Sequence, residues 1–165
     1  MTVYRGWDGP RRFEGMYELL VFVHVLGAVV WLGSGVFAQV QARKAFATGD
    51  RAVIGGFMES MEAAASIIFN VFPLLTLLAG IGLVIWSPAW GFSQFWVYGA
   101  LVLVAVTIVF GAVLSNRAMI EVRKAVDDDD GAGLTTAVAR MTRFGNIDLL
   151  VLLAILALMV FKPGL

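Results

Sequence analysis

The sequence predicts an all-α membrane protein built as a four-transmembrane-helix bundle. Of its 165 residues, 60% are hydrophobic and 15% are charged, whereas soluble globular domains are about 45–50% apolar and about 25% charged. A membrane-spanning helix needs about 20 mainly apolar residues. Four segments meet this requirement, at about 16–40, 63–86, 95–115 and 145–161. We interpret residues 1–165 as a single membrane domain.

The charge balance and the absence of cysteine exclude several classes of protein. Lys and Arg together number 12, as do Asp and Glu, so no basic surplus is present to neutralise a nucleic-acid backbone. The chain has no Cys, which excludes disulfides, thiolate-bound zinc, iron–sulfur clusters and Cys-linked haem. We therefore expect the lipid bilayer, and no nucleic acid, as a partner.

The first apolar segment, 16–40, is predicted to be a membrane helix with one packed face. It is too long for a cleavable signal sequence and lacks an A-x-A cleavage motif. At 100° per residue, small and polar side chains share one arc and large apolar ones lie opposite. The packed arc holds His24, Gly27, Trp31, Ser34, Gly35 and Gln39, and the lipid-facing arc holds Phe22, Leu26, Val29, Val36 and Val40.

Similar arcs of small and polar residues mark the second and third segments. They consist of Ser66, Asn70, Pro73, Thr76 and Gly80, and of Ala100, Thr107, Gly111 and Ser115. Such residues allow close helix packing and hydrogen bonds between helices. Pro73 leaves the carbonyl of Phe69 without its helical donor, so we expect a kink in mid-membrane. Gly82 is predicted to point away from the packed arc.

The distribution of Lys and Arg predicts the orientation in the membrane. Eight lie in the first and third connections and four on the other side. The eight are Arg43, Lys44, Arg51, Arg117, Arg123, Lys124, Arg140 and Arg143, and the four are Arg5, Arg11, Arg12 and Lys162. We expect a multi-pass membrane protein with connections one and three in the cytoplasm and both termini outside.

Two connections have distinctive compositions. The run 127–133, DDDDGAG, lies in the third connection, and we interpret it as a solvated, flexible tip. The short outer turn brings Trp86, Trp90 and Trp96 to one membrane interface, where indole rings anchor a protein.

Asp148 is an acid expected inside the fourth segment, on a face that also carries Ile155, Met159 and Lys162. A carboxylate in a membrane is costly unless it is paired or reached by water. We expect an ion pair with Arg140 or Arg143 that closes the base of the bundle. The alternative is a proton-relay role, which calls for a chain of successive acids.

His24 is the leading candidate for a binding site. It lies on the packed arc, roughly 12 Å below the outer boundary by helix rise, and a neutral imidazole is a good ligand for haem iron or copper. The alternative is a histidine that hydrogen-bonds a neighbouring helix, with Trp31 packed two turns further along the same arc.

Several stretches of the sequence resemble one bacterial superfamily of membrane proteins. Residues 18–35, ELLVFVHVLGAVVWLGSG, have the His, small-residue and Trp-x-Gly pattern of its first span, and 73–80, PLLTLLAG, resemble its second. Residues 143–146, RFGN, and 159–164, MVFKPG, resemble the Arg-x-x-Asn and Lys-Pro elements of its fourth. The superfamily includes CopD copper-resistance membrane domains, HemJ-type protoporphyrinogen oxidases and uncharacterised four-span proteins. Residues 96–116 contain neither the His nor the Lys typical of HemJ-type third spans, so the chain is most similar to the uncharacterised branch.

The resemblance implies a protein of the bacterial inner (plasma) membrane, and the likeness to the HemJ branch implies a b-type haem. His24 matches the candidate ligand and Lys162 the functional lysine of that branch. Because the chain has one His, the sixth ligand must come from Met159, Lys162, water or a histidine of another subunit. Trp31 completes the candidate cofactor site.

Three functions therefore remain in competition. A haem-binding or redox-associated membrane protein is placed first. A non-catalytic accessory or structural subunit of a larger membrane complex is the alternative. The protein partners expected besides lipid are other membrane subunits or, in a homo-oligomer, further copies of the chain. Copper or small-solute movement by analogy with CopD is placed last, since one His, no Cys and the loop residues Met58 and Met61 do not form a ladder of ligands through a membrane.

Overall fold

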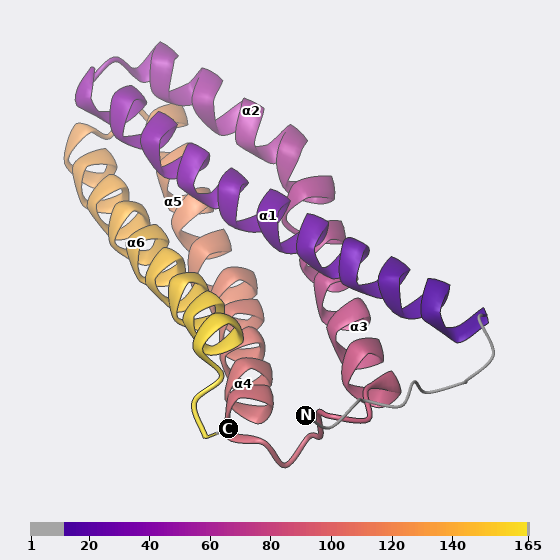
Figure 1. The fold of residues 1–165 in the computed structure, drawn as a ribbon. Coiled ribbons are helices and arrows are strands. Elements are labelled where there is room, and N and C mark those ends of the chain that lie inside the picture. The colour runs from indigo at the N-terminus through magenta and orange to yellow at the C-terminus, as the bar shows by residue number, and fades with distance from the viewer. Residues whose placement is uncertain (1–11, 165) are drawn as a thin grey trace.

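The computed structural model describes residues 12–164, and every regular element in this range is helical (Figure 1). The elements are α1 (Arg12–Ala47), α2 (Arg51–Ile68), α3 (Val71–Trp86), α4 (Phe95–Phe110), η1 (Gly111–Ser115, a π-helical turn), α5 (Asn116–Asp127) and α6 (Gly131–Phe161). Arg5 and Arg11 lie outside the described residues, as do the side chains of 12–14, 64–66 and 112. The predicted packing of the Ser66 side chain therefore stays a prediction.

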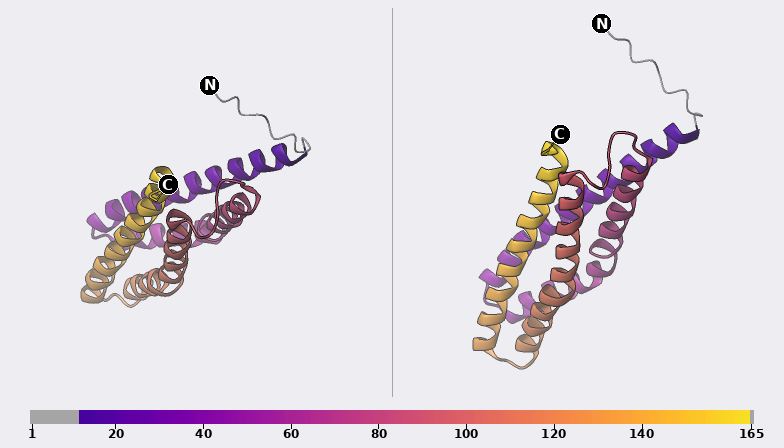
Figure 2. Two further views of the ribbon diagram at one scale, coloured as in Figure 1. Left: turned by 60° about the horizontal axis from the view of Figure 1, so that its bottom comes forward. Right: turned by 90° about the horizontal axis from the view of Figure 1, so that it is seen from below.

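The helices form four rods that run antiparallel in succession. α1 is the first rod, α2 and α3 make the second, α4, η1 and α5 make the third, and α6 is the fourth (Figure 1). α1 packs on α3, α6 and α2, while α6 also packs on α4, η1 and α5. α3 packs on α1 rather than on α4, although α3 and α4 are consecutive in the chain (Figure 2).

Three helices are long and apolar enough to cross a membrane. Within the described residues they are Gly15–Ala47, Phe95–Asp127 and Gly131–Phe161, and α3 is a shorter apolar helix. The last of the three has 31 residues and measures about 47 Å at 1.5 Å per residue. Because a hydrocarbon core is about 30 Å thick, these helices are longer than a single crossing requires.

The predicted packed and exposed arcs of α1 are confirmed, as is the burial of Ala100 and Thr107 on the predicted packed arc of α4. Phe22 and Val29 are 62% and 63% exposed, whereas Trp31 is 7% exposed. In α4, Ala100 and Thr107 are buried, as their arc predicted. The large apolar side chains thus lie where lipid tails would cover them.

One end of the bundle has its own hydrophobic core and carries ion pairs, and we call it the charged end. It comprises α2, α5 and the adjoining parts of α1 and α6, and its buried core consists of Ile54, Met58, Val122, Ala125, Leu134 and Ala137. Ion pairs join neighbouring rods around this core: Arg51 with Asp129, Arg123 with Glu62, and Arg140 with Glu121. The opposite end, with the α3–α4 loop and Trp86, Trp90 and Trp96, is called the tryptophan end.

The predicted solvent exposure of the run 127–133 is confirmed for residues 127–132, but the run is helical at both ends, and its flexibility stays a prediction. α5 continues to Asp127 and α6 begins at Gly131, so the turn comprises 128–130 alone. Oδ1 of Asp130 accepts a hydrogen bond of 2.9 Å from the N–H of Gly133 and so caps α6. Because a carboxylate stabilises a helix N-terminus, the acidic run begins a helix here.

The kink expected at Pro73 is instead a break between two helices. α2 ends at Ile68 and α3 begins at Val71, so Pro73 is buried in the first turn of α3. An N–H in a first turn has no partner within its helix, which makes proline acceptable at that position. The second rod can therefore change direction before Pro73.

Candidate functional site

His24 lies at the contact between α1 and α3. Its Nδ1 is 2.8 Å from the carbonyl oxygen of Thr76. Because a carbonyl oxygen can only accept a hydrogen bond, Nδ1 must carry the proton, and the neutral imidazole then has its lone pair on Nε2. The side chain is half-buried. The predicted place of His24 on the packed face is confirmed, with a backbone carbonyl as its partner.

Two glycines let α1 and α3 approach closely around this bond. A Cβ on Gly80 would lie 2.9 Å from Cε1 and 3.0 Å from Nδ1 of His24. A Cβ on Gly27 would lie 3.3 Å from the carbonyl oxygen of Phe72 and would also meet the hydroxyl of Thr76. Contacts between carbon atoms are normally about 3.5–4.0 Å, so the ring of His24 occupies the space that a side chain at position 80 would need.

The prediction that Gly82 points away from the packed face is wrong. Gly82 is buried, and a Cβ there would lie 3.2 Å from Cδ1 of Leu20. The buried residues of α3 are Pro73, Thr76, Ala79 and Gly82, which form a row with a spacing of three. Such a row turns gradually around a helix of 3.6 residues per turn, and it brings Gly82 under α1.

His24 and Lys162 contact different parts of the bundle. Lys162 ends α6 in the left-handed region with φ of 43°, and its Nζ lies 4.2 Å from the ring centroid of Trp90. α1 and α6 diverge toward the tryptophan end in Figure 1 and in the right-hand view of Figure 2. These contacts favour an interfacial anchoring role for Lys162, while iron ligation by Met159 or Lys162 stays a prediction.

A second polar cluster lies where α1 crosses α6. The amide of Gln39 occupies the space over Gly145, where a Cβ would lie 2.6 Å from its Cδ. One turn along α1, Nη2 of Arg43 donates a hydrogen bond of 2.9 Å to Oδ1 of Asn146. Sequence reasoning placed Gln39 on the packed face but missed its position against Gly145 and the pairing of Arg43 with Asn146.

The expected ion pair between Asp148 and Arg140 is not formed. Nη1 of Arg140 lies 2.8 Å from both carboxylate oxygens of Glu121. Arg140 precedes Asp148 by about two turns of α6, which is about 12 Å along the helix, and there it faces α5. Arg143 is exposed, and the ion pairs within residues 12–164 do not include Asp148.

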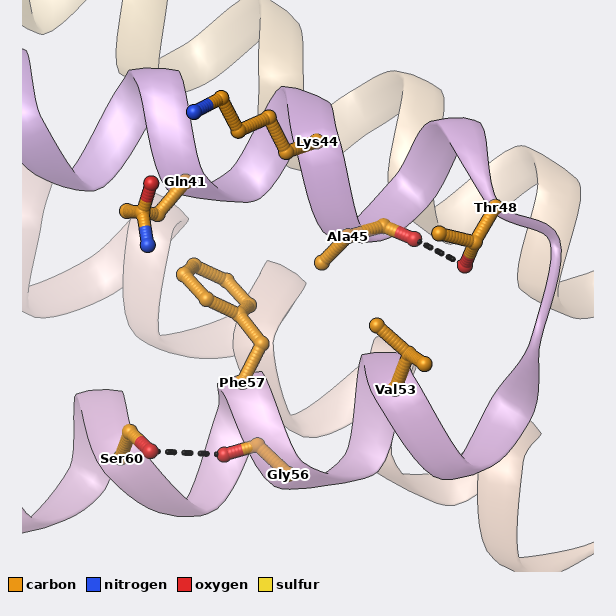
Figure 3. A pocket seen from close by; sticks show the side chains of 8 residues that line it. All are labelled: Gln41, Lys44, Ala45, Thr48, Val53, Gly56, Phe57 and Ser60. Atoms are coloured by element: carbon orange, nitrogen blue, oxygen red, sulfur yellow. Dashed lines mark hydrogen bonds between the residues drawn. The ribbon is translucent and has the colours of Figure 1, made fainter.

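A groove of about 390 Å³ lies between α1 and α2 at the charged end (Figure 3). Its lining residues are Gln41, Lys44, Ala45, Thr48, Val53, Gly56, Phe57 and Ser60. The hydroxyls of Thr48 and Ser60 donate to the carbonyls of Ala45 and Gly56 at 2.6 and 2.8 Å, and Figure 3 shows the amine of Lys44 directed away from α2. These polar groups are therefore not arranged around a common ligand position.

The chain matches a family of membrane proteins, in agreement with its three helices of membrane-spanning length. Residues 18–163, from α1 to the end of α6, match the family described as a predicted integral membrane protein, DUF2269. The chain belongs to this family. This DUF2269 protein is thus a multi-pass membrane protein with an all-helical fold.

No curated protein and no solved structure matches it. Within the described residues, the DUF2269 chain has no group of three or more His, Cys, Asp or Glu side chains that could hold a metal ion.

Proposed function

We propose that this DUF2269 protein binds a b-type haem, with Nε2 of His24 as an axial ligand to the iron. The observation that carries the proposal is the hydrogen bond between Nδ1 of His24 and the carbonyl of Thr76. A histidine that binds a metal almost always donates its other ring N–H to a carbonyl, a carboxylate or water, which fixes the tautomer and the ring orientation. His24 has this arrangement on a half-buried side chain. The resemblance of residues 18–35 to HemJ-type and CopD first spans adds support, and a relation to those proteins is part of the proposal.

The other residues of the site would hold the ligand in place. The Thr76 carbonyl orients the ring, Gly80 leaves room for it, and the buried Trp31 adds apolar cover on the same face of α1. A bound haem would supply one-electron or dioxygen chemistry. Because Lys162 lies over Trp90, we assign the second ligand to Met159, to water or to a group from another chain.

The absorption spectrum of protein purified from haem-replete cells tests this proposal. His24→Asn is the matched variant, because the Asn amide can replace Nδ1 as donor to Thr76 but offers no imidazole to iron. A Soret band in the wild type that is lost in a folded His24→Asn variant is the expected result. Folded wild-type protein without porphyrin would remove the haem proposal.

The second candidate function is that of an accessory or structural subunit of a larger membrane complex. It is favoured by the same contact, because helix packing alone accounts for the hydrogen bond of His24 and the burial of Trp31. Such a subunit needs no cofactor. Stoichiometric co-purification with a different membrane protein in mild detergent is its expected result, whereas isolation as a monomer or homo-oligomer argues against it.

We also propose that the charged end faces the cytoplasm across a bacterial inner membrane that the four rods span. The support is the excess of Lys and Arg in the first and third connections, which belong to the charged end, over the tryptophan end. Trp86, Trp90 and Trp96 then lie at the outer interface, where Lys162 over Trp90 strengthens the anchoring.

A further inference from the structure

Two buried oxygen atoms lack hydrogen-bond partners at the crossing of α1 and α6. They are Oε1 of Gln39 and Oδ1 of Asp148, and neither has a donor within the described part of the chain. A Cβ on Gly145 would lie 3.0 Å from Oε1 of Gln39. Asp148 follows Gly145 by three positions, which places the two residues on the same face of α6. Helix geometry thus places Asp148 on the face of α6 that meets Gln39 of α1.

The cationic groups near this contact are engaged elsewhere or exposed toward the charged end. On α1, Arg43 donates to Asn146 and Lys44 is exposed; on α6, Arg140 pairs with Glu121 and Arg143 is exposed; on α5, Arg117 is exposed. α3, α4 and η1 contain no acid or base apart from Tyr98, which lies near the tryptophan end of α4. Asp148 thus has no cation to neutralise it within residues 12–164.

We propose that Asp148 is an intramembrane proton-binding site whose carboxylic acid donates a hydrogen bond to Oε1 of Gln39. Two oxygen acceptors cannot bond one another, but a neutral carboxyl group carries one O–H donor. A single proton therefore satisfies both buried oxygens. An ionised carboxylate in a membrane is costly without a cation or water, so proton binding is the chemistry that this contact requires. The site is independent of the haem proposal, since His24 contacts α3.

The proton couples the contact between α1 and α6 to pH. When Asp148 loses its proton, a carboxylate faces an amide oxygen and the tie between the helices is lost. Because the folded chain holds a proton that the unfolded chain releases at neutral pH, the free energy of unfolding falls as the pH rises. This fall ends where Asp148 ionises in the folded protein.

Infrared difference spectroscopy on the full chain in lipid nanodiscs tests the proposal, with the pH varied from about 5 to about 9. The expected result is the C=O stretch of one protonated carboxylic acid, sensitive to H/D exchange, that disappears at alkaline pH. Asp148→Asn should remove this band and the associated pH dependence of unfolding, because an amide has no acidic proton. The variant should still fold, since its amide can donate a hydrogen bond to Gln39. Asp128→Asn, the same change at an exposed acid of the turn between α5 and α6, should leave both unchanged.

Two results would overturn the proposal. One is the absence of an Asp148-dependent acid band at every pH at which the protein is folded. The other is stabilisation by Na⁺ over choline at constant pH that requires Asp148, because this would identify a metal cation as the ligand. If Asp148→Asn does not fold, Gln39→Leu is the second test. This variant removes the oxygen that accepts the proposed hydrogen bond, so the carboxylic acid band must shift, and an unshifted band would contradict the proposal.

Discussion

The carbonyl oxygen of Thr76 accepts a hydrogen bond of 2.8 Å from Nδ1 of His24, and the ring of His24 lies in the space over Gly80. This contact joins the first rod to the second within the apolar part of the bundle. A single imidazole thereby contributes to the packing of two helices, and its second nitrogen keeps a lone pair for a ligand.

Gly80→Ala should destabilise the protein by about 1–3 kcal/mol, the usual cost of overpacking a well-packed contact. The new Cβ would lie 2.9 Å from the ring of His24, which cannot move away without losing its hydrogen bond to Thr76. Gly33→Ala is the matched control, because a Cβ there meets nothing within 4 Å. Unfolding by SDS titration in mixed micelles measures both. Equal losses of stability would show that the contact is not packed as described.

The charged end should respond to core mutations as a soluble domain does. Ile54→Ala is expected to cost about 2–5 kcal/mol through lost burial and a residual cavity, because Ile54 is 2% exposed. Its neighbour Val53 is 44% exposed, so Val53→Ala should change the stability by no more than about 0.5 kcal/mol. Thermal unfolding of the two variants in detergent gives the comparison, and a larger loss at Val53 would contradict the assigned core.

The orientation in the membrane can be tested with single cysteines, because the chain has none of its own. We expect Ala47→Cys and Asp128→Cys, at exposed positions of the charged end, to react with a membrane-impermeant maleimide only after the cells are opened. Ser93→Cys, in the exposed α3–α4 loop, should react in intact cells. The reverse pattern at all three positions would invert the orientation and leave the fold intact.

Helix periodicity predicted the faces of the rods because it depends on local sequence. Phe22, Val29 and Trp31 lie where the 100° rotation per residue places them. The place of His24 on a packed face follows from the same argument. In both cases the residue types in adjacent turns of one helix were enough to predict which face packs.

The predictions that the structure corrects concern features that depend on a partner helix or on one local hydrogen bond. Gly82 is buried because Leu20 of α1 lies over it, and the register between α1 and α3 cannot be read from either segment alone. The side chain of Asp130 converts an acidic, glycine-containing run into a helix start. Arg140 pairs with Glu121 because the helices continue past the predicted spans and bring α5 beside α6.

The haem content of the purified protein, measured by the pyridine haemochrome assay, tests the central functional proposal most directly. We expect close to one haem per chain in wild-type protein from haem-replete cells, and almost none in His24→Asn at unchanged stability, because that variant keeps the donor to Thr76 but lacks the imidazole. Folded wild-type protein that contains no haem, or a His24→Asn variant that retains it, would contradict the assignment of His24 as the axial ligand.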